Sequence, residues 1–389
     1  MRFETVRFEF VLPGRIVFGN GCSGDLPSLA KEMGSRCILV TGSSPERLHG
    51  LVEELGSSGI LGRVFRVERE PTTDDVRRGV LEARQAECDL VVSIGGGSAI
   101  DTGKAVSAML TNPGDLEDYL EVVGKARPLA NPCAPLIAVP PTAGTGSEAT
   151  KNAVLISKEH GVKVSLRSIM LLPALVLVDP ALTLSLPPRL TACTGLDALT
   201  QLLEAFVSRA SNPMTDCLCR EGLSRAAGSL LAAYRTGDAI EPRADMSLAS
   251  LLSGMALANA GLGAVHGLAA AIGGLYRAPH GFVCASLLAG VVEANILSLC
   301  RPGEPSRAID KYTEASRILT GDSQEDPADL VRWIKRLCRE LEAPSLSELG
   351  VDKAGFEPIV ARALRSSSMR GNPVVLSEDE LMDILAGAL

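Results

Sequence analysis

The feature that most restricts the fold of this chain is a series of short, continuously apolar runs separated by segments of helical periodicity. The clearest runs are Arg36–Thr41, Asp89–Ile94, Pro135–Val139 and Ala174–Val178. Continuous rather than alternating apolar character is typical of strands buried on both faces, as in a parallel sheet covered by helices. The first half of the chain is therefore predicted to be an α/β domain, whose ligands should bind at the carboxyl ends of the strands.

The intervening segments give further predictions. Helices are expected over Leu26–Met33, over Glu46–Leu55, and from a cap at Thr72 or Thr73 to about Ala86. Short strands are expected over Arg63–Val67 and over Arg15–Phe18, and the latter could pair with a strand formed by the alternating residues Val6, Phe8 and Phe10. From about Leu182 strand signals fade and helical periodicity dominates, so a domain boundary is predicted there, followed by an all-helical second half.

Two glycine clusters each follow a predicted buried strand. Gly95–Ser98 comes directly before a predicted helix, so backbone N–H groups and the positive helix end could approach an anion closely. It is not a Walker A loop, because Ala105 follows Gly103-Lys104 where Ser or Thr is required. Gly144–Ala149 matches the dinucleotide pattern GxGxxA, but no clear helix follows it. Either cluster alone could be a tight turn, and together they predict a dinucleotide pyrophosphate site.

Two of the four histidines, His266 and His280, lie fourteen residues apart among small apolar residues. Imidazoles in such surroundings can coordinate a metal in a partly dry pocket. For either histidine taken alone, however, a buried core histidine at 266 or a loop residue at 280 is the favoured explanation. No charged residue occurs from Met246 through Tyr276, which is long enough for a transmembrane helix. Its serines, glycines and His266 favour a buried helix pair instead.

A predicted helix places polar side chains near this candidate site. Asp197 and Gln201 are four residues apart and share a helix face, and Glu204 lies three residues further along the same side. An aspartate near a helix start can simply oppose the helix dipole. Combined with His266 and His280, however, Asp197 could supply the anionic oxygen that a divalent ion requires.

Composition narrows the functional classes. A net charge of −8 and an aromatic content of 3% argue against nucleic acid as a partner. The ten scattered cysteines include no CxxC pair, and the N-terminus lacks the apolar core of a signal peptide. We therefore expect reduced thiols, a cytoplasmic location and no membrane attachment.

Several motifs, in order along nearly the whole chain, resemble the iron-containing (group III) alcohol dehydrogenases. They are Gly95–Lys104, Pro141–Glu148, Val178–Pro180, Gly195–Thr200, Val265–Gly267 and Pro279–Gly281. The resemblance implies the dehydroquinate synthase-like fold of that family: a dinucleotide-binding α/β domain over residues 1–182 and an all-helical metal and substrate domain over 183–389. It also implies a homodimer or higher homo-oligomer.

The resemblance further implies a site in which a metal polarises the oxygen of a small alcohol or aldehyde while hydride passes to or from NAD or NADP. The metal, Fe(II) or Zn(II), would be held by Asp197, Gln201, His266 and His280, and Asp197, His266 and His280 would be catalytic. The residues expected to bind the dinucleotide are Gly42, Gly95, Gly96, Gly97, Ser98, Asp101, Thr142, Thr145, Lys163 and Leu182.

Three departures from the family pattern matter. Gln201 stands where the family usually has a histidine ligand, and an amide oxygen binds iron or zinc more weakly than imidazole does. Ala270 stands where many members carry a second histidine near the nicotinamide. Gly42, followed by Ser43 and Ser44 with Arg47 nearby, replaces an aspartate that would repel a 2′-phosphate, so NADP should be tolerated.

Other functions remain open on the sequence alone. One is a metal-independent reductase of oxo-acids, similar to maleylacetate reductase, in which Gln201 would bind substrate. Another is a nucleotide-binding relative that has lost catalysis. A dehydroquinate-synthase-like activity is disfavoured, because Arg277 is the one basic residue near the two histidines that could meet a phosphorylated substrate.

Overall fold

The computed structural model describes residues 7–42, 48–276, 278–301 and 307–389. Ser43, Ser44, Arg47 and Arg277 lie outside these ranges, so the predictions that involve them are not addressed. The chain forms two compact units. One is Leu12–Ser185, and the other is Leu186–Leu389 together with the N-terminal segment up to Val11.

The first unit is built on a parallel six-stranded sheet with the strand order β1-β8-β5-β4-β2-β3, which confirms the predicted α/β class. Its strands are β1 (Arg15–Phe18), β2 (Cys37–Thr41), β3 (Leu61–Arg66), β4 (Leu90–Ile94), β5 (Leu136–Val139) and β8 (Leu175–Val178). Every residue of β2, β4, β5 and β8 is buried, as their continuous apolar runs require. The register places the carboxyl ends of β2, β4 and β5 side by side.

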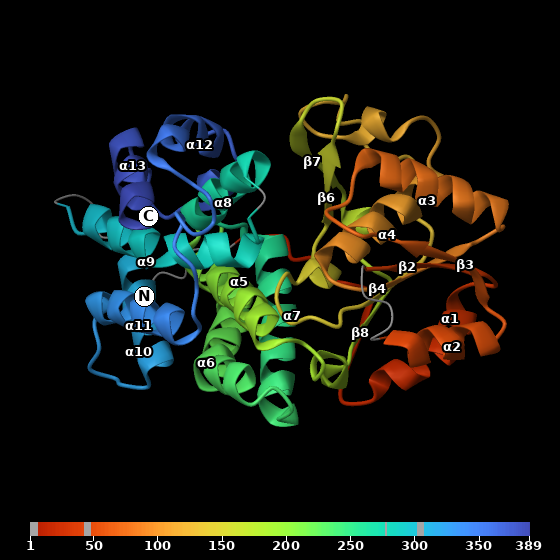
Figure 1. The fold of residues 1–389 in the computed structure, drawn as a ribbon, viewed down its shortest axis with the longest axis horizontal. Coiled ribbons are helices and arrows are strands. Elements are labelled where there is room, and N and C mark those ends of the chain that lie inside the picture. The colour runs from red at the N-terminus through yellow and green to blue at the C-terminus, as the bar shows by residue number, and fades with distance from the viewer. Residues whose placement is uncertain (1–6, 43–47, 277, 302–306) are drawn as a thin grey trace. The chain divides into compact units, whose positions relative to one another are not determined.

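Helices cover both faces of this sheet. α1 (Leu26–Met33) and α2 (His49–Ser57) pack on one face, and α3 (Thr73–Gln85) and α4 (Gly97–Thr111) pack on the other (Figure 1). The start of α3 is fixed by a capping box, in which Thr72 and Asp75 each accept a hydrogen bond from the other's backbone N–H. Of the two predicted caps, Thr72 is therefore the one used.

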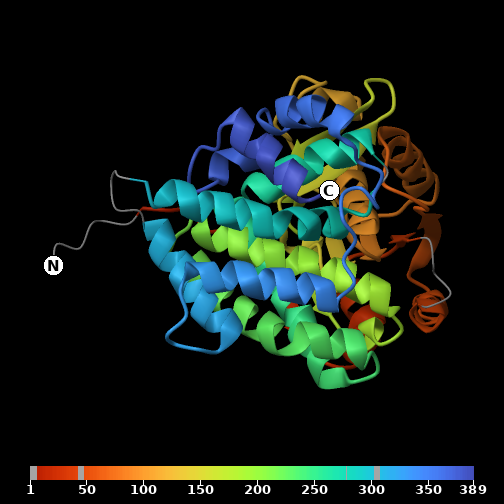
Figure 2. The ribbon, with the colours of Figure 1, turned by 60° about the vertical axis from the view of Figure 1, so that its left-hand side comes forward.

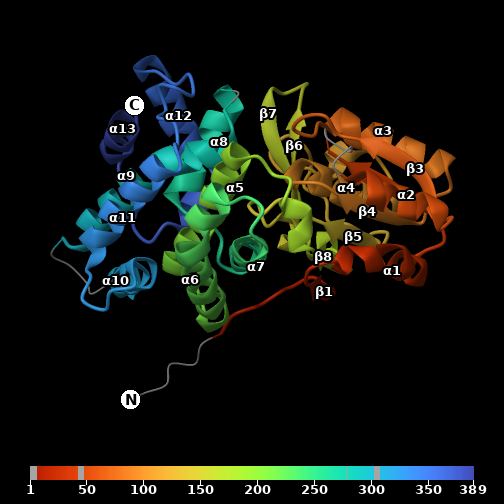
Figure 3. The ribbon, with the colours of Figure 1, turned by 60° about the horizontal axis from the view of Figure 1, so that its bottom comes forward.

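An antiparallel hairpin of β6 (Asn152–Ser157) and β7 (Val162–Arg167) was not predicted. It forms a separate two-stranded sheet that contacts α4, and it stands beside the main sheet rather than within it (Figure 3). The turn between its strands contains Gly161 at φ 64°, in the left-handed region that glycine adopts without strain. The alternation of β7 was the signal that could have revealed it.

The prediction that β1 pairs with an N-terminal strand is wrong. β1 pairs with β8, and the described residues from 7 to 14 contain no strand. At Val11 the side chain of Asn259 takes the place of a neighbouring strand, because it accepts a hydrogen bond from the Val11 N–H at 2.7 Å and donates one to the Val11 carbonyl at 2.9 Å. The backbone polar groups are thus satisfied without a sheet partner.

The second unit is helical, as predicted. Its helices are α5 (Pro188–Val207), α6 (Pro213–Arg235), α7 (Ile240–Ala260), α8 (Ala264–Leu275), α9 (His280–Leu299), α10 (Arg307–Thr320), α11 (Pro327–Glu340), α12 (Phe356–Ala363) and α13 (Glu378–Gly387). The long α5 is central, because it contacts α6, α7, α9 and α10, and several of these helices lie side by side in Figure 2. Ser377 and Glu380 form a capping box at the start of α13.

The uncharged stretch from Met246 to Tyr276 forms the predicted buried helix pair rather than one span. α7 and α8 meet at a bend of 98° around Gly261, whose φ is 70°. By length and composition α9 alone could also cross a membrane, but it contacts α5, α8 and α11, and half of its most apolar window is buried. These helices act as core elements of their unit.

Candidate functional site

The helix α5 carries the predicted carboxylate and amide of the site. Asp197, Gln201 and Glu204 are all buried, with 3–5% of each residue exposed. Asp197 lies nine residues, or about two and a half turns, after Pro188, the proline that begins the helix. Burying three polar side chains on one side of a helix costs free energy unless each has a polar partner. The partners of these three side chains therefore indicate the role of this side of α5.

The two predicted histidines approach Asp197 from different helices. His266 lies in the first turn of α8, with its Nε2 3.4 Å from Asp197 Oδ1. His280 is the first residue of α9, with its Nε2 3.8 Å from the same oxygen. Gly281 permits this approach, because a Cβ at that position would overlap the carbonyl of Cys193 on α5.

A fourth side chain, Cys284, joins this group and was missed by the sequence reasoning. Its Sγ lies 3.9 Å from His266 Nε2 and 3.7 Å from His280 Nε2, and one donor atom from each of Asp197, His266, His280 and Cys284 lies within 4.8 Å of the others. Cys284 follows His280 by four residues on α9, so the two share a helix face. That spacing was the available signal.

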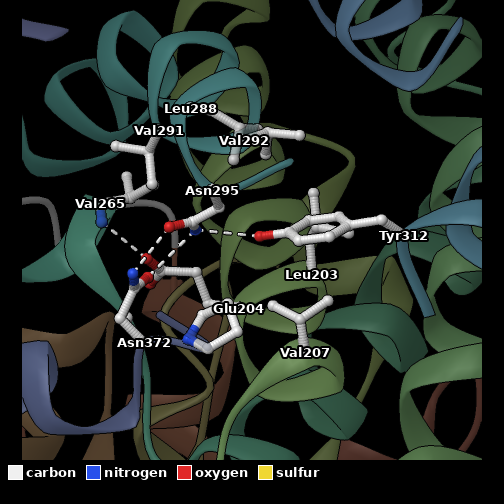
Figure 4. Close-up of a pocket in the computed structure, with 12 residues that line it drawn as sticks. Leu203, Glu204, Val207, Val265, Leu288, Val291, Val292, Asn295, Tyr312 and Asn372 are labelled. Carbon is white, nitrogen blue, oxygen red and sulfur yellow. Dashed lines mark hydrogen bonds between the residues drawn. The ribbon is translucent and has the colours of Figure 1, made fainter. Parts of the chain in front are cut away.

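Glu204 does not reach the cluster but orients one of its members. Its carboxylate accepts hydrogen bonds from His266 Nδ1 at 2.6 Å and from the Val265 N–H at 2.7 Å. Because Nδ1 donates to Glu204, Nε2 is the nitrogen left for a metal, and it points toward Asp197. Figure 4 shows Glu204 at one side of a small pocket, beside the buried pair Asn295 and Asn372.

Gln201 is held between Asp197 and Ser253. Its side chain forms a hydrogen bond with the Asp197 carboxylate, in which the amide N–H is the donor, and its Oε1 lies 2.8 Å from Ser253 Oγ. The amide nitrogen, rather than the oxygen, therefore faces the carboxylate.

The electrostatics of the cluster favour anionic groups facing the imidazoles. Burial would raise the pKa of Asp197, but interactions with His266, His280 and Gln201 outweigh it and lower the pKa. Burial would likewise raise the pKa of Cys284, and the two histidines lower it instead. Burial lowers the pKa of His266, but the charges of Cys284 and Glu204 raise it well above its usual value. The charge of Cys284 also raises the pKa of His280.

These groups fit a divalent metal. Asp197 Oδ1 is a buried carboxylate oxygen without a hydrogen-bond partner among the described residues, although both imidazoles point toward it. A tetrahedral ion about 2.0–2.3 Å from N, O and S donors would separate them by roughly 3.3–3.6 Å, close to the 3.4–3.9 Å observed. The His280 side chain is 42% exposed, so the cluster is open on that side.

The predicted phosphate loop is formed where three strands of the sheet unit end. Gly95–Gly97 follows β4 and begins α4, and among the described residues no side chain caps this helix. A Cβ at Gly96 would lie 3.4 Å from Thr142 Oγ1, and one at Gly97 would lie 3.3 Å from Thr145 Cγ2. A Cβ at Gly95 would lie 3.3 Å from the backbone nitrogen of Gly42, which follows β2. Gly42, Gly96 and Gly97 are partly exposed, so their backbone could approach a pyrophosphate, which stays a prediction.

The remaining residues predicted to bind the dinucleotide also lie in the sheet unit. Ser98 is half-buried in the first turn of α4, and Leu182 packs on the core beneath the sheet. The Asp101 carboxylate accepts hydrogen bonds from Ser147 Oγ and from the Val154 N–H, so it fixes the position of the second glycine-rich loop, Gly144–Ala149. Lys163 on β7 forms an ion pair with Glu70 at 2.6 Å. No contact of these residues tests a cofactor role, which stays a prediction.

A buried lysine holds the second glycine-rich loop in place. Lys104 Nζ donates to the carbonyl oxygens of Ser147, Thr150 and Asn152 at 2.6–3.0 Å and is fully buried. Burial lowers its pKa to about 8. The loop ends in a short 3₁₀ turn, Ser147–Ala149, so the absence of a following α-helix is as predicted.

Comparisons with known families cover both units of the chain. The model of iron-containing alcohol dehydrogenase matches residues 13–180, and that of the C-terminal part of the same family matches residues 191–389. The chain belongs to the iron-containing alcohol dehydrogenase family. It is 35% identical over 385 residues to alcohol dehydrogenase 4 of Saccharomyces cerevisiae, which covers 97% of this chain and 98% of the relative.

Solved structures of the family share the fold over nearly the full length. A 1,3-propanediol oxidoreductase is 31% identical with a TM-score of 0.91, covering 99% of this chain and 100% of its own. A sulfoacetaldehyde reductase from Bifidobacterium kashiwanohense, solved with NAD⁺, is 26% identical with a TM-score of 0.87, covering 98% and 99%. This iron-containing alcohol dehydrogenase is thus an oxidoreductase of a family that uses NAD(H) and a divalent metal.

Proposed function

We propose that this enzyme oxidises small alcohols or reduces small aldehydes and ketones, with a divalent ion, Fe(II) or Zn(II), held by Asp197, His266 and His280. The observation that carries the proposal is the buried Asp197 Oδ1, which lies between two imidazoles and accepts no hydrogen bond from the residues that the structure describes. Gln201, the fourth member of the predicted ligand set, then acts by holding the Asp197 carboxylate. The ion would polarise the substrate oxygen and make an alcohol easier to deprotonate.

The chain's own residues supply orientation and access. Glu204 keeps the His266 proton on Nδ1 and so leaves Nε2 available as a ligand. His280 is the exposed ligand, so substrate should approach from its side. Ala270 is exposed on α8 and offers no proton-carrying group, so proton release should depend on solvent rather than on a second histidine.

The dinucleotide should lie on Gly95–Ser98, with Gly42, Thr142 and Thr145 beside it. It would exchange hydride with the carbinol or carbonyl carbon of the substrate. Both NAD and NADP should be accepted, because Gly42 carries no carboxylate to repel a 2′-phosphate. Small alcohols and diols are the proposed substrates, since relatives include alcohol dehydrogenase 4 and 1,3-propanediol oxidoreductase.

The proposed setting is a reducing cytoplasm, which is supported by the ten cysteines, all free and all within the described residues. A homodimer or higher homo-oligomer is also proposed. β1 lies at the edge of the sheet, where a second copy could pair with it.

The test is metal removal and restoration. Protein stripped with a strong chelator should lose alcohol-dependent reduction of NAD⁺ or NADP⁺ and regain it with Fe(II) or Zn(II). Asp197→Ala should bind the dinucleotide but neither retain metal nor turn over. Chelator-resistant turnover of oxo-acids by the wild type and by Asp197→Ala would instead establish the metal-independent reductase. Dinucleotide binding without turnover on any alcohol or aldehyde would establish a non-catalytic relative.

A further inference from the structure

Cys284 occupies a position at the cluster that no part of the family resemblance assigns. Its side chain is fully buried on α9, one turn after His280. Each contact that the structure gives its sulfur is with an imidazole nitrogen, at 3.9 Å to His266 and 3.7 Å to His280. Both separations are longer than a strong hydrogen bond and close to the edge of a tetrahedron around a shared ion.

The side-chain amide of Gln201, which the sequence analysis predicts as the fourth ligand, does not direct its oxygen toward Asp197. Gln201 donates its N–H to the Asp197 carboxylate, and its Oε1 lies 2.8 Å from Ser253 Oγ. An amide N–H has no lone pair for a metal, so Gln201 could ligate only after its amide reversed and gave up the hydrogen bond to Asp197. Cys284 needs no such change.

We propose that the Cys284 sulfur, rather than the Gln201 amide, is the fourth protein ligand of the metal. The inference rests on the proposed function, since it concerns the same site. The ligands are then one carboxylate oxygen, two imidazole nitrogens and one thiolate sulfur. A thiolate selects zinc over the harder, oxygen-preferring ions, and two anionic ligands balance the charge of a divalent cation. Cys284 thus biases this member of the family toward zinc over iron.

Cobalt substitution tests this directly, because a thiolate bound to Co(II) gives an intense near-ultraviolet charge-transfer band that oxygen and nitrogen ligands do not. Wild-type protein loaded with one Co(II) per chain should show the band. Cys284→Ser should lose the band and should bind Zn(II) more than about 100-fold more weakly than the wild type. A loss of that size exceeds the decrease in metal affinity of about 10–100-fold that is typical when a residue that only supports a ligand is replaced. Its bound Zn:Fe ratio in competition should fall at least about tenfold.

Two variants serve as matched controls. Cys193→Ser removes a buried thiol one turn before Asp197 on α5 that lies outside the ligand group, and it should keep the band. Gln201→Ala should keep it as well. X-ray absorption of the zinc-loaded wild type should show a sulfur at about 2.3 Å, which makes the proposal independent of how well Cys284→Ser folds.

The outcomes separate the two proposals. Wild-type protein that binds one Co(II) and turns over alcohol, but shows neither the band nor a sulfur neighbour, overturns the role of Cys284 and leaves the proposed function standing. A band that survives in Cys284→Ser and disappears in Cys193→Ser also overturns it. A wild-type chain that binds no divalent ion at all overturns both.

Discussion

Replacing Glu204 by glutamine probes how the protein prepares His266 for the metal. Glu204 accepts two hydrogen bonds, from His266 Nδ1 at 2.6 Å and from the Val265 N–H at 2.7 Å. Glutamine has one acceptor oxygen, so one of these two donors must face an amide N–H. If the oxygen stays on Val265, the imidazole can relieve the conflict only by moving its proton to Nε2, which removes the lone pair that the ion requires.

The expected cost follows from that conflict. Losing a carboxylate that orients a ligating histidine lowers metal affinity by about 10–100-fold, or roughly 1.4–2.7 kcal/mol. Zinc affinity should be measured by competition with a chromophoric chelator. Glu314→Gln, which alters an exposed ion pair with Arg220 in the same unit, should leave the affinity unchanged. A Glu204→Gln dissociation constant within about twofold of wild type would refute the assigned role of Glu204.

Three further predictions concern the sheet unit. Lys104→Met should destabilise it by about 3–5 kcal/mol in urea unfolding, because three carbonyls around the buried ammonium lose their donor. Lys125→Met at an exposed pair should cost under about 1 kcal/mol. Burial raises the pKa of Glu148 from 4.5 to about 7. The wild-type free energy of unfolding should therefore fall as pH rises from about 4.5 through 7, because the folded state must then hold a buried carboxylate. The stability of Glu148→Gln relative to wild type should therefore increase by about 2–3 kcal/mol from pH 5 to pH 8, and a constant difference would contradict this. Gly97→Val should fill the space beside Thr145 and weaken NAD⁺ binding at least about tenfold by calorimetry, while Gly228→Ala, at an open position on α6, should not.

The architecture could be predicted from the sequence because strands buried on both faces are continuously apolar, as β2, β4, β5 and β8 are. The predicted pairing of β1 with an N-terminal strand was wrong, because alternation of polar and apolar residues does not show what a segment pairs with. At Val11 the side chain of Asn259 forms the hydrogen bonds that a neighbouring strand would form.

At the site, the sequence placed Asp197, His266 and His280 together because their residue types are rare and chemically specific. Cys284 was one of ten scattered cysteines, and only the packing of α8 against α9 shows which one reaches the histidines. The orientation of the Gln201 amide likewise depends on Ser253, a residue 52 positions away on α7. Contacts of this kind are set by helix packing and leave no local pattern.

The most direct test of the account is a crystal structure of the protein grown with Zn(II) and measured at the zinc absorption edge. We expect one anomalous peak in the helical unit, about 2.0–2.3 Å from Asp197 Oδ1, His266 Nε2, His280 Nε2 and Cys284 Sγ. No peak at these four atoms, in a protein that still oxidises alcohols after chelation, would contradict the account.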